Sequence, residues 1–139
     1  MTTQELLNLS EKRGYIEVPS DLCGLEAASL LLPSGNCAWT VDATGLSSAE
    51  YRGKLGHELG HCEEGAFYTR LSAPTARGKC EEMAARWEIR HLLPRTALRA
   101  ALKNGIRTSW ELAEYFDLPE PLVLRAVAYY RVKRKIAEK

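Results

Sequence analysis

The order of hydrophobic and polar positions predicts short strands in the first third of the chain. Residues 15–18 are followed by apolar runs at 28–32 and 37–41, each bounded by turn-forming residues and too short for an ordinary helix. The segment Pro-Ser-Gly-Asn at 33–36 is a strong turn signal, so the two apolar runs are expected to form a β-hairpin. The pattern therefore predicts a small, three-stranded sheet.

Helices are predicted for most of the remaining chain, where capping signals precede segments with helical spacing of apolar residues. The sequence Ser/Thr-x-x-Glu, which can form a capping box, begins at Thr2, Ser47 and Thr108. Residues 66–77 have no clear period and contain Pro74, which predicts a loop. The predicted helices comprise residues 5–12, the segment between Ser47 and Gly65, and residues 78–93, 95–103, 109–116 and 119–133.

The helix between Ser47 and Gly65 contains Gly53, Gly56 and Gly60 on one stripe of its surface. Each glycine inside a helix costs roughly 1 kcal/mol relative to alanine. Their grouping therefore predicts that another backbone packs very close to this stripe, and we expect that backbone to belong to the sheet.

The same helix carries the sequence His-Glu-Leu-Gly-His at 57–61. Residues four apart lie one above the other on a helix, so His57 and His61 present both imidazoles on one face, as two ligands of a Zn²⁺ ion would. Glu58 lies about 100° round the helix, where it can act as general base on a zinc-activated water without being a ligand. The pattern is typical of zinc metallopeptidases; the simpler alternative is a surface helix with two unrelated histidines.

A catalytic zinc ion usually has three protein ligands and one water, so one ligand must come from elsewhere. Glu81 is the preferred candidate, because Ala84 and Ala85 lie on its own face of the next helix and allow the two helices to approach closely. Glu82 is disfavoured, because Arg86 four residues later would compete for its carboxylate. The third ligand is therefore predicted to be Glu81.

Four further residues are candidates for roles near this site. If Glu64 were the third ligand, all three ligands would come from one straight helix, and three such side chains rarely converge on one metal ion. Glu88, on the same face as Glu81, is expected either to orient a histidine or to be an ordinary exposed or ion-paired glutamate. His91 is expected to be a packed or surface histidine and not a ligand. Tyr68 and His91 are both candidate donors to the oxyanion of a peptidase reaction, and their spacing does not choose between them.

The composition is that of an ordinary globular protein, with 45% hydrophobic and 27% charged residues in a chain of 139. This length is expected for one domain with its own core. The formal net charge of +1 argues against a dedicated nucleic-acid binder, which usually has a strongly basic face. No apolar run reaches the length of a membrane span and the first residues do not resemble a secretory signal, so we expect a cytoplasmic protein without a membrane partner.

The four cysteines, Cys23, Cys37, Cys62 and Cys80, lack the CxxC spacing of a structural zinc cluster. An even count could form two disulfides, but without a secretory signal reduced thiols are the expected state. Cys62 and Cys80 each adjoin a predicted metal ligand, and both are expected to be small buried residues. Cys62 lies about 100° round the helix from His61, which points it away from the ion.

Two segments, LGHELGHCEEGAFY at 55–68 and KCEEMAARWEIRHLLP at 79–94, resemble the ImmA/IrrE family of zinc metallopeptidases. The chain is most similar to the short versions carried by prophages and integrative elements of Gram-positive bacteria. The resemblance is strong over 46–94 and weaker toward both ends. It implies a gluzincin-like endopeptidase in which His57, His61 and Glu81 bind Zn²⁺ and Glu58 is catalytic.

The chain departs from the family at two positions. Relatives often carry Asp or Asn at the position of Ala85, and a small residue where Glu88 stands. The surroundings of the metal ligands are therefore expected to be rearranged here, with Glu88 taking over an orienting role.

The resemblance also implies a fold, a cellular role and a substrate. The expected fold is an α+β, zincin-like minimal metallopeptidase, with a three-stranded sheet packed on the HExxH helix. Residues 1–104 would form the catalytic core and 105–139 a helical extension similar to a helix-turn-helix. Relatives cleave a helix-turn-helix transcriptional repressor, often encoded by the neighbouring gene, and so act as anti-repressors of a prophage or mobile element.

The alternative function is binding without proteolysis. Residues 110–127 resemble a helix-turn-helix, so the last helices could bind DNA, or the chain could sequester its repressor without cutting it. Against DNA binding, the second helix offers only Arg125 among its central residues, whereas Leu122 and Val123 require burial. Nucleic acid is therefore the less favoured partner.

Overall fold

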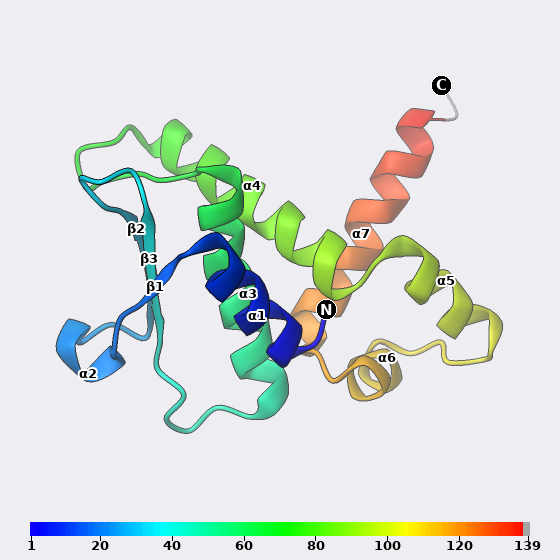
Figure 1. Ribbon diagram of the computed structural model, residues 1–139. Helices are drawn as coiled ribbons and strands as arrows, with labels where there is room; N and C mark the ends of the chain where they lie inside the picture. The colour runs from blue at the N-terminus through cyan, green and yellow to red at the C-terminus, as the bar shows by residue number, and fades with distance from the viewer. Residues whose placement is uncertain (138–139) are drawn as a thin grey trace.

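The protein is an α+β molecule in which a small, three-stranded sheet lies at one side and most of the helices lie to one side of it (Figure 1). The structure is a computed structural model that describes residues 1–137, and the side chains of all of these except residues 22, 23 and 132–137. The strands are β1 (Ile16–Glu17), β2 (Ala27–Leu31) and β3 (Cys37–Val41). The helices are α1 (Thr3–Arg13), α2 (Ser20–Cys23), α3 (Ser48–Glu64), α4 (Pro74–Leu92), α5 (Arg95–Lys103), α6 (Ser109–Phe116) and α7 (Glu120–Ala137).

The sheet has the strand order β1-β3-β2, with β3 in the centre. β2 and β3 form the predicted antiparallel hairpin, in which Ser29 pairs with Trp39, and β1 runs parallel to β3. β2 is therefore an edge strand, whose second edge is not paired with a strand of the described residues. Because β2 packs beside α3, this unpaired edge lies next to the helix that contains both histidines.

Helix α3 lies between the sheet and α4 in the middle of the molecule (Figure 1). Its ends are those predicted from the sequence. Ser47 and Glu50 form a capping box at its start, and Gly65 ends it in the left-handed conformation with φ of 61°. Local signals thus fix the length and the position of the helix that carries both histidines.

Several helices differ from the sequence prediction: α1, for example, spans Thr3–Arg13 and not 5–12. α4 begins at Pro74 and not at Gly78, because proline occupies the first turn of the helix, where its missing N–H costs nothing. The short helix α2 was not predicted, since four residues carry too little periodicity to be recognised. α7 continues to Ala137, beyond the expected end at 133.

The glycine stripe of α3 does allow a very close neighbour, but that neighbour is α4 and not the sheet. A Cβ atom added at Gly60 would lie 2.7 Å from the backbone oxygen of Ala84. One added at Gly56 would lie 2.7 Å from Cδ1 of Leu92. The expectation of a sheet was wrong because helical spacing identifies a face that needs space, but not which element fills it.

We expect Gly60→Ala to destabilise the fold by about 2–3 kcal/mol, because the new methyl group would overlap the α4 backbone, which cannot move aside as a side chain can. Gly78→Ala is the matched control. Gly78 lies in α4 with nothing within 4 Å of an added Cβ, so there alanine should stabilise by about 1 kcal/mol. Urea unfolding of both variants measures the difference; equal midpoints would contradict the close packing.

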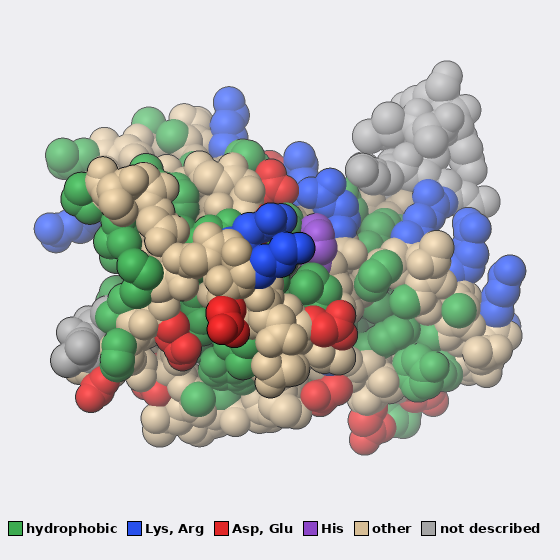
Figure 2. Space-filling view, viewed as in Figure 1, with side chains coloured by type: hydrophobic (Ala, Val, Ile, Leu, Met, Phe, Trp, Pro, Cys, Tyr) green, Lys and Arg blue, Asp and Glu red, His purple; other side chains and the backbone are tan. Residues whose placement is uncertain are grey.

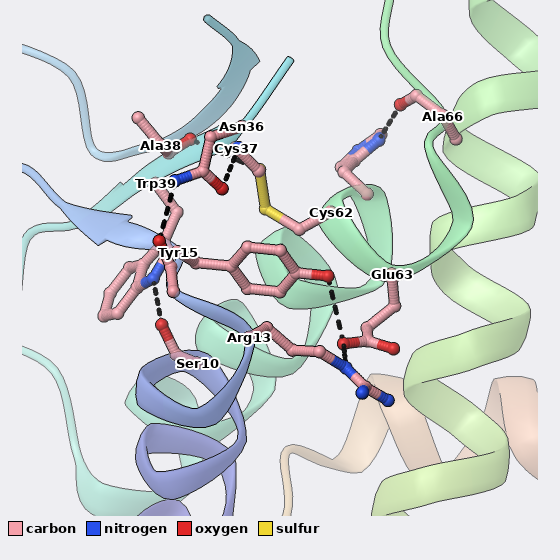
Figure 3. Close-up of a disulfide and its surroundings, with 12 residues drawn as sticks. Ser10, Arg13, Tyr15, Asn36, Cys37, Ala38, Trp39, Cys62, Glu63 and Ala66 are labelled. Carbon is pink, nitrogen blue, oxygen red and sulfur yellow. Dashed lines mark hydrogen bonds and ion pairs between the residues drawn. A yellow bond between two sulfur atoms is a disulfide. The ribbon is translucent and has the colours of Figure 1, made fainter. Parts of the chain in front are cut away.

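Cys37 of β3 and Cys62 of α3 form a disulfide, which corrects the expectation of reduced thiols for these two residues (Figure 3). Their Cα atoms are 5.6 Å apart, within the range that a disulfide requires. Sequence spacing could not show this, because the pair meets only when the sheet packs on α3. Cys80 is free and half-buried, and the side chain of Cys23 is not among those that the structure describes.

Reducing this disulfide is expected to lower the free energy of unfolding by about 3 kcal/mol, because the bond closes a loop with a sequence separation of 25. Denaturant unfolding with and without dithiothreitol measures the change. Cys37→Ala should abolish the response to reductant, whereas Cys80→Ala should retain it. An unaltered midpoint in the reduced wild type would argue that the two thiols are not joined in solution.

The last two helices pack into the same core as the sheet and α3. Pro119, before α7, lies against α3, where a Cβ added at Gly53 would be 3.1 Å from its Cγ. At the start of α3, the Ser48 hydroxyl donates to the Asp117 carboxylate at 3.0 and 3.2 Å. The buried residues that this part contributes are Leu112, Leu118, Leu122, Val123 and Ala126. A boundary at residue 104 stays a prediction.

In the described part of the chain, every helix is too short or too polar to pass through a membrane.

Candidate metal centre

Three predicted ligands converge where α3 faces the start of α4. His57 and His61 lie on one face of α3, with ring centroids 5.0 Å apart. Glu81 of α4 reaches both imidazoles: Oε2 lies 2.7 Å from Nε2 of His57, and Oε1 lies 3.2 Å from Nε2 of His61. One ligand atom from each of the three residues lies within 4.8 Å of the other two. His57, His61 and Glu81 can therefore hold a metal ion.

The other nitrogen of each imidazole is engaged on its outer side. Nδ1 of His61 donates to the backbone oxygen of Ala66, at 2.6 Å. Nδ1 of His57 lies 3.0 Å from Oε2 of Glu88, which is the contact with a histidine expected for this glutamate. With Nδ1 engaged on the outer side of both rings, the Nε2 atoms face Glu81, and they are the atoms that become available to a cation once they give up their protons.

The donor set consists of two imidazole nitrogens and one carboxylate. Catalytic zinc sites use this set, as do non-haem iron sites, so the donors alone do not select the metal. Both histidines come from one helix and the carboxylate from a second, which leaves the side facing β2 open to solvent and substrate. Three protein donors leave one position of a tetrahedral ion open, whereas a closed structural site uses four protein ligands.

The electrostatics of the site favour a cation. Burial opposes a charge on His57, but the hydrogen bonds and negative charges of Glu88 and Glu81 outweigh it and raise its pKa to about 9. Burial raises the pKa of Glu81, but hydrogen bonds from Tyr68 and His57 and the nearby imidazoles reverse this and lower it overall. Two carboxylates thus stabilise positive charge where the histidines meet.

Glu58 is a buried carboxylate beside the ligands, and it is not one of them. Burial raises its pKa, and this effect outweighs the hydrogen bond with Ser29 and the attraction of His57 and His61, which lower it. A carboxylate with a raised pKa is a stronger base than one in water, which suits proton transfer near neutral pH.

Two adjoining hollows meet at Glu58. The first, of about 200 Å³, is lined by residues of β2, α3 and the segment 66–68, together with Glu81. The second, of about 360 Å³, is lined by α3 residues together with Glu88, Pro119 and Arg125. Ala27 of β2 and Glu58 line both hollows, so together they form one groove along the edge strand.

The two candidate donors to an oxyanion lie in different places. Tyr68 lines the first hollow and its hydroxyl donates to Oε1 of Glu81 at 2.7 Å. His91 stacks on Trp87 with ring centroids 4.0 Å apart, and its Nδ1 contacts the Trp87 backbone oxygen at 2.8 Å. His91 does not line either hollow of the groove. Of the two candidates, Tyr68 is therefore the one that lies beside the predicted ligands, and its role as a donor stays a prediction.

Glu82 and Glu64, which were not preferred as ligands, form ion pairs with arginines of α4. Glu82 forms an ion pair with Arg86, the contact anticipated from their spacing. Glu64 lies 3.4 Å from Arg90 of α4. Neither carboxylate belongs to the metal-binding group of the described residues.

Two residues of the groove were missed by sequence reasoning. Ser29 contacts Glu58 from β2, and its only signal was a hydroxyl within an apolar strand. Arg125 lies 3.7 Å from Oε1 of Glu88, and nothing in its local sequence connects α7 with the histidines. Its place at the site depends on the tertiary packing of the last helix.

Comparison of the chain with models of protein families found no match, and comparisons with curated proteins and with solved structures found none either. Function is therefore inferred from the side chains and their geometry. They provide a cation site, an adjacent buried base and a groove bordered by an edge strand.

Proposed function

We propose that the protein is a zinc-dependent endopeptidase with a zincin-like fold. The observation that carries the proposal is the convergence of His57, His61 and Glu81 beside the buried carboxylate of Glu58, on the floor of an open groove. A structural zinc site would need neither the groove nor a base beside the ligands. The resemblance of residues 46–94 to ImmA/IrrE metallopeptidases supports the same assignment.

In the proposed reaction, His57, His61 and Glu81 hold the ion and Glu58 moves protons. When bound, zinc supplies Lewis-acid activation of a water molecule and of the scissile carbonyl. Glu58 accepts the proton of the water as its oxygen attacks the carbonyl carbon, and then gives that proton to the departing amine nitrogen. The C–N bond breaks, and a carboxylate and an amine leave the groove.

Tyr68 is proposed to stabilise the negative charge that develops on the carbonyl oxygen. The hydrogen bond to Glu81 is the main cause of the raised pKa of Tyr68, so the phenol keeps its proton. Turned from Glu81 toward the substrate, this neutral O–H is the kind of donor that an oxyanion requires.

The groove suits an extended peptide. Residues 27–29 of β2 line it, and β2 has a free edge whose N–H and C=O groups can pair with another strand. A substrate segment added to this edge would lie over Glu58 and the ligands. The backbone would supply affinity, and the side chains that enter the two hollows would supply specificity.

The proposed substrate is a helix-turn-helix transcriptional repressor in the cytoplasm, as the family resemblance implies. Direct DNA binding by the last helices is not favoured, because Arg125 is paired with the buried Glu88. On the face that Figure 2 shows, most Lys and Arg side chains lie in the upper half, with apolar and uncharged side chains between them, and most acidic side chains lie in the lower half.

Zinc reconstitution tests the proposed function. The chelator-stripped protein is loaded with one equivalent of Zn²⁺ and incubated with a mixture of proteome-derived peptides and, separately, with the repressor encoded beside its gene. New amino termini, identified by mass spectrometry, are expected with the loaded protein and not with the stripped one. Zinc binding together with repressor binding, but without cleavage of either substrate, would establish the non-cleaving alternative.

A further inference from the structure

Glu88 is a buried carboxylate that joins the metal centre to the C-terminal helix. Its side chain is 3% exposed, and its two oxygens have different partners. Oε2 lies 3.0 Å from Nδ1 of His57, and Oε1 lies 3.7 Å from a guanidinium nitrogen of Arg125. A buried carboxylate needs partners for both oxygens, and Arg125 gives Oε1 an ion pair beside the contact that Oε2 makes with His57.

We propose that Arg125 is a positioning residue of the metal centre, acting through Glu88 to hold the His57 imidazole with Nε2 turned toward Glu81. The inference rests on the proposed function in so far as the centre binds zinc. Arg125 itself touches neither the ligand atoms nor the reacting atoms. It holds one oxygen of Glu88, and the other oxygen then accepts from Nδ1 of His57 in a fixed direction.

The position of Arg125 is fixed by the core contacts of α7. Leu122, Val123 and Ala126 on this helix are fully buried, so the rotation of α7 about its axis is determined. This rotation places Arg125 at the border between core and solvent, where it also lines the second hollow beside Pro119. The C-terminal part is therefore a component of the metal centre in this proposal, and not a separate binding module.

An ion pair with an exposed partner usually contributes little, and the Arg125 side chain is 49% exposed. The difference here lies in Glu88, which is too buried to be solvated by water when the arginine is removed. Deleting one partner of such a pair leaves Oε1 of Glu88 without the contact that fixes its direction. The carboxylate would then be free to turn, and its hydrogen bond with His57 would be disturbed.

Zinc affinity is the first measurement, by competition with a chelating dye. Loss of a residue that orients a ligand typically weakens metal binding 10- to 100-fold, and we expect about 10-fold for Arg125→Met. Arg125→Lys keeps a cation and should recover most of the affinity. Arg131→Met, which removes the same charge from an exposed position of α7, is the matched control and should bind as the wild type does.

A double-mutant cycle separates positioning from general packing. In a Glu88→Gln background, Arg125→Met should have no further effect on zinc affinity, because its route to His57 is already lost. A merely structural role would leave the tenfold effect in place. Thermal unfolding identifies any variant that fails to fold, in which case Arg125→Gln replaces Arg125→Met.

The imidazole resonances of the zinc-free protein give a readout that does not require metal binding. A hydrogen-bonded Nδ1 proton of His57 should be visible by NMR in the wild type and in Arg125→Lys, and lost in Arg125→Met. Its persistence in Arg125→Met would overturn the proposal, as would unchanged zinc affinity. If the wild type binds no zinc but the signal is lost in Arg125→Met, the proposed peptidase function fails and the positioning role stands.

Discussion

Glu58→Gln is expected to lower kcat for peptide hydrolysis by about 10³-fold while zinc stays bound. Glutamine keeps the size of the side chain and can still contact Ser29, but it cannot take a proton from the attacking water. Glu58 is not among the ligands, so metal content should remain at one equivalent. Steady-state hydrolysis of a peptide found in the zinc-reconstitution assay, together with metal analysis of the same sample, measures both quantities.

Glu63→Gln is the matched control for this substitution. Glu63 lies on the same helix, but its carboxylate contacts Arg13 and Tyr15 (Figure 3) and lines neither hollow of the groove. The same chemical change there should leave kcat within about twofold of the wild type, since Glu63 is in contact with neither the groove nor the three predicted ligands. Activity of Glu58→Gln within tenfold of the wild type would exclude Glu58 as the general base.

The helix that carries the histidines could be predicted almost completely, because its signals are local. Ser47 and Gly65 fix its ends, and the spacing of His57 and His61 fixes their common face. The hairpin was equally accessible, since its turn residues separate two apolar runs. Both features depend on neighbours within a few positions, which a single sequence displays.

Features that depend on tertiary packing could be predicted only in part. Helical angle showed that Gly60 needs a close neighbour, but Ala84 of α4 was identified only by the fold. The Cys37–Cys62 bond and the contact of Arg125 with Glu88 join segments far apart in the chain. No local pattern marks such pairs, because they form when separate elements are brought together.

The identification of Glu81 as the third ligand depends partly on local sequence and partly on tertiary packing. Small residues on its face indicated where α4 could approach α3, and Ala84 is the residue against which Gly60 packs. Because Gly60 has no side chain and Ala84 has only a methyl group, the two backbones approach closely enough for the Glu81 carboxylate to reach both imidazoles. The glycine stripe thus permits the same helix contact that brings Glu81 to the two histidines.

Glu81→Ala is expected to lower zinc affinity by at least about 10³-fold, because loss of a direct ligand costs more than the 10- to 100-fold typical of residues that only orient a ligand. Glu82→Ala, at the next position of α4, is the matched control. Its carboxylate pairs with Arg86 and takes no part in the site, so its affinity should equal that of the wild type. Competition with a chelating dye measures both variants.

The comparison between the two glutamates tests the helix contact itself. Both lie on α4 and differ by one residue, so they differ mainly in the direction in which they leave the helix. Equal losses of affinity would mean that α4 is rotated relative to α3, and that Ala84 does not face Gly60. Loss in Glu81→Ala alone would require the close approach at Gly60, since only that packing brings the Glu81 carboxylate to both histidines.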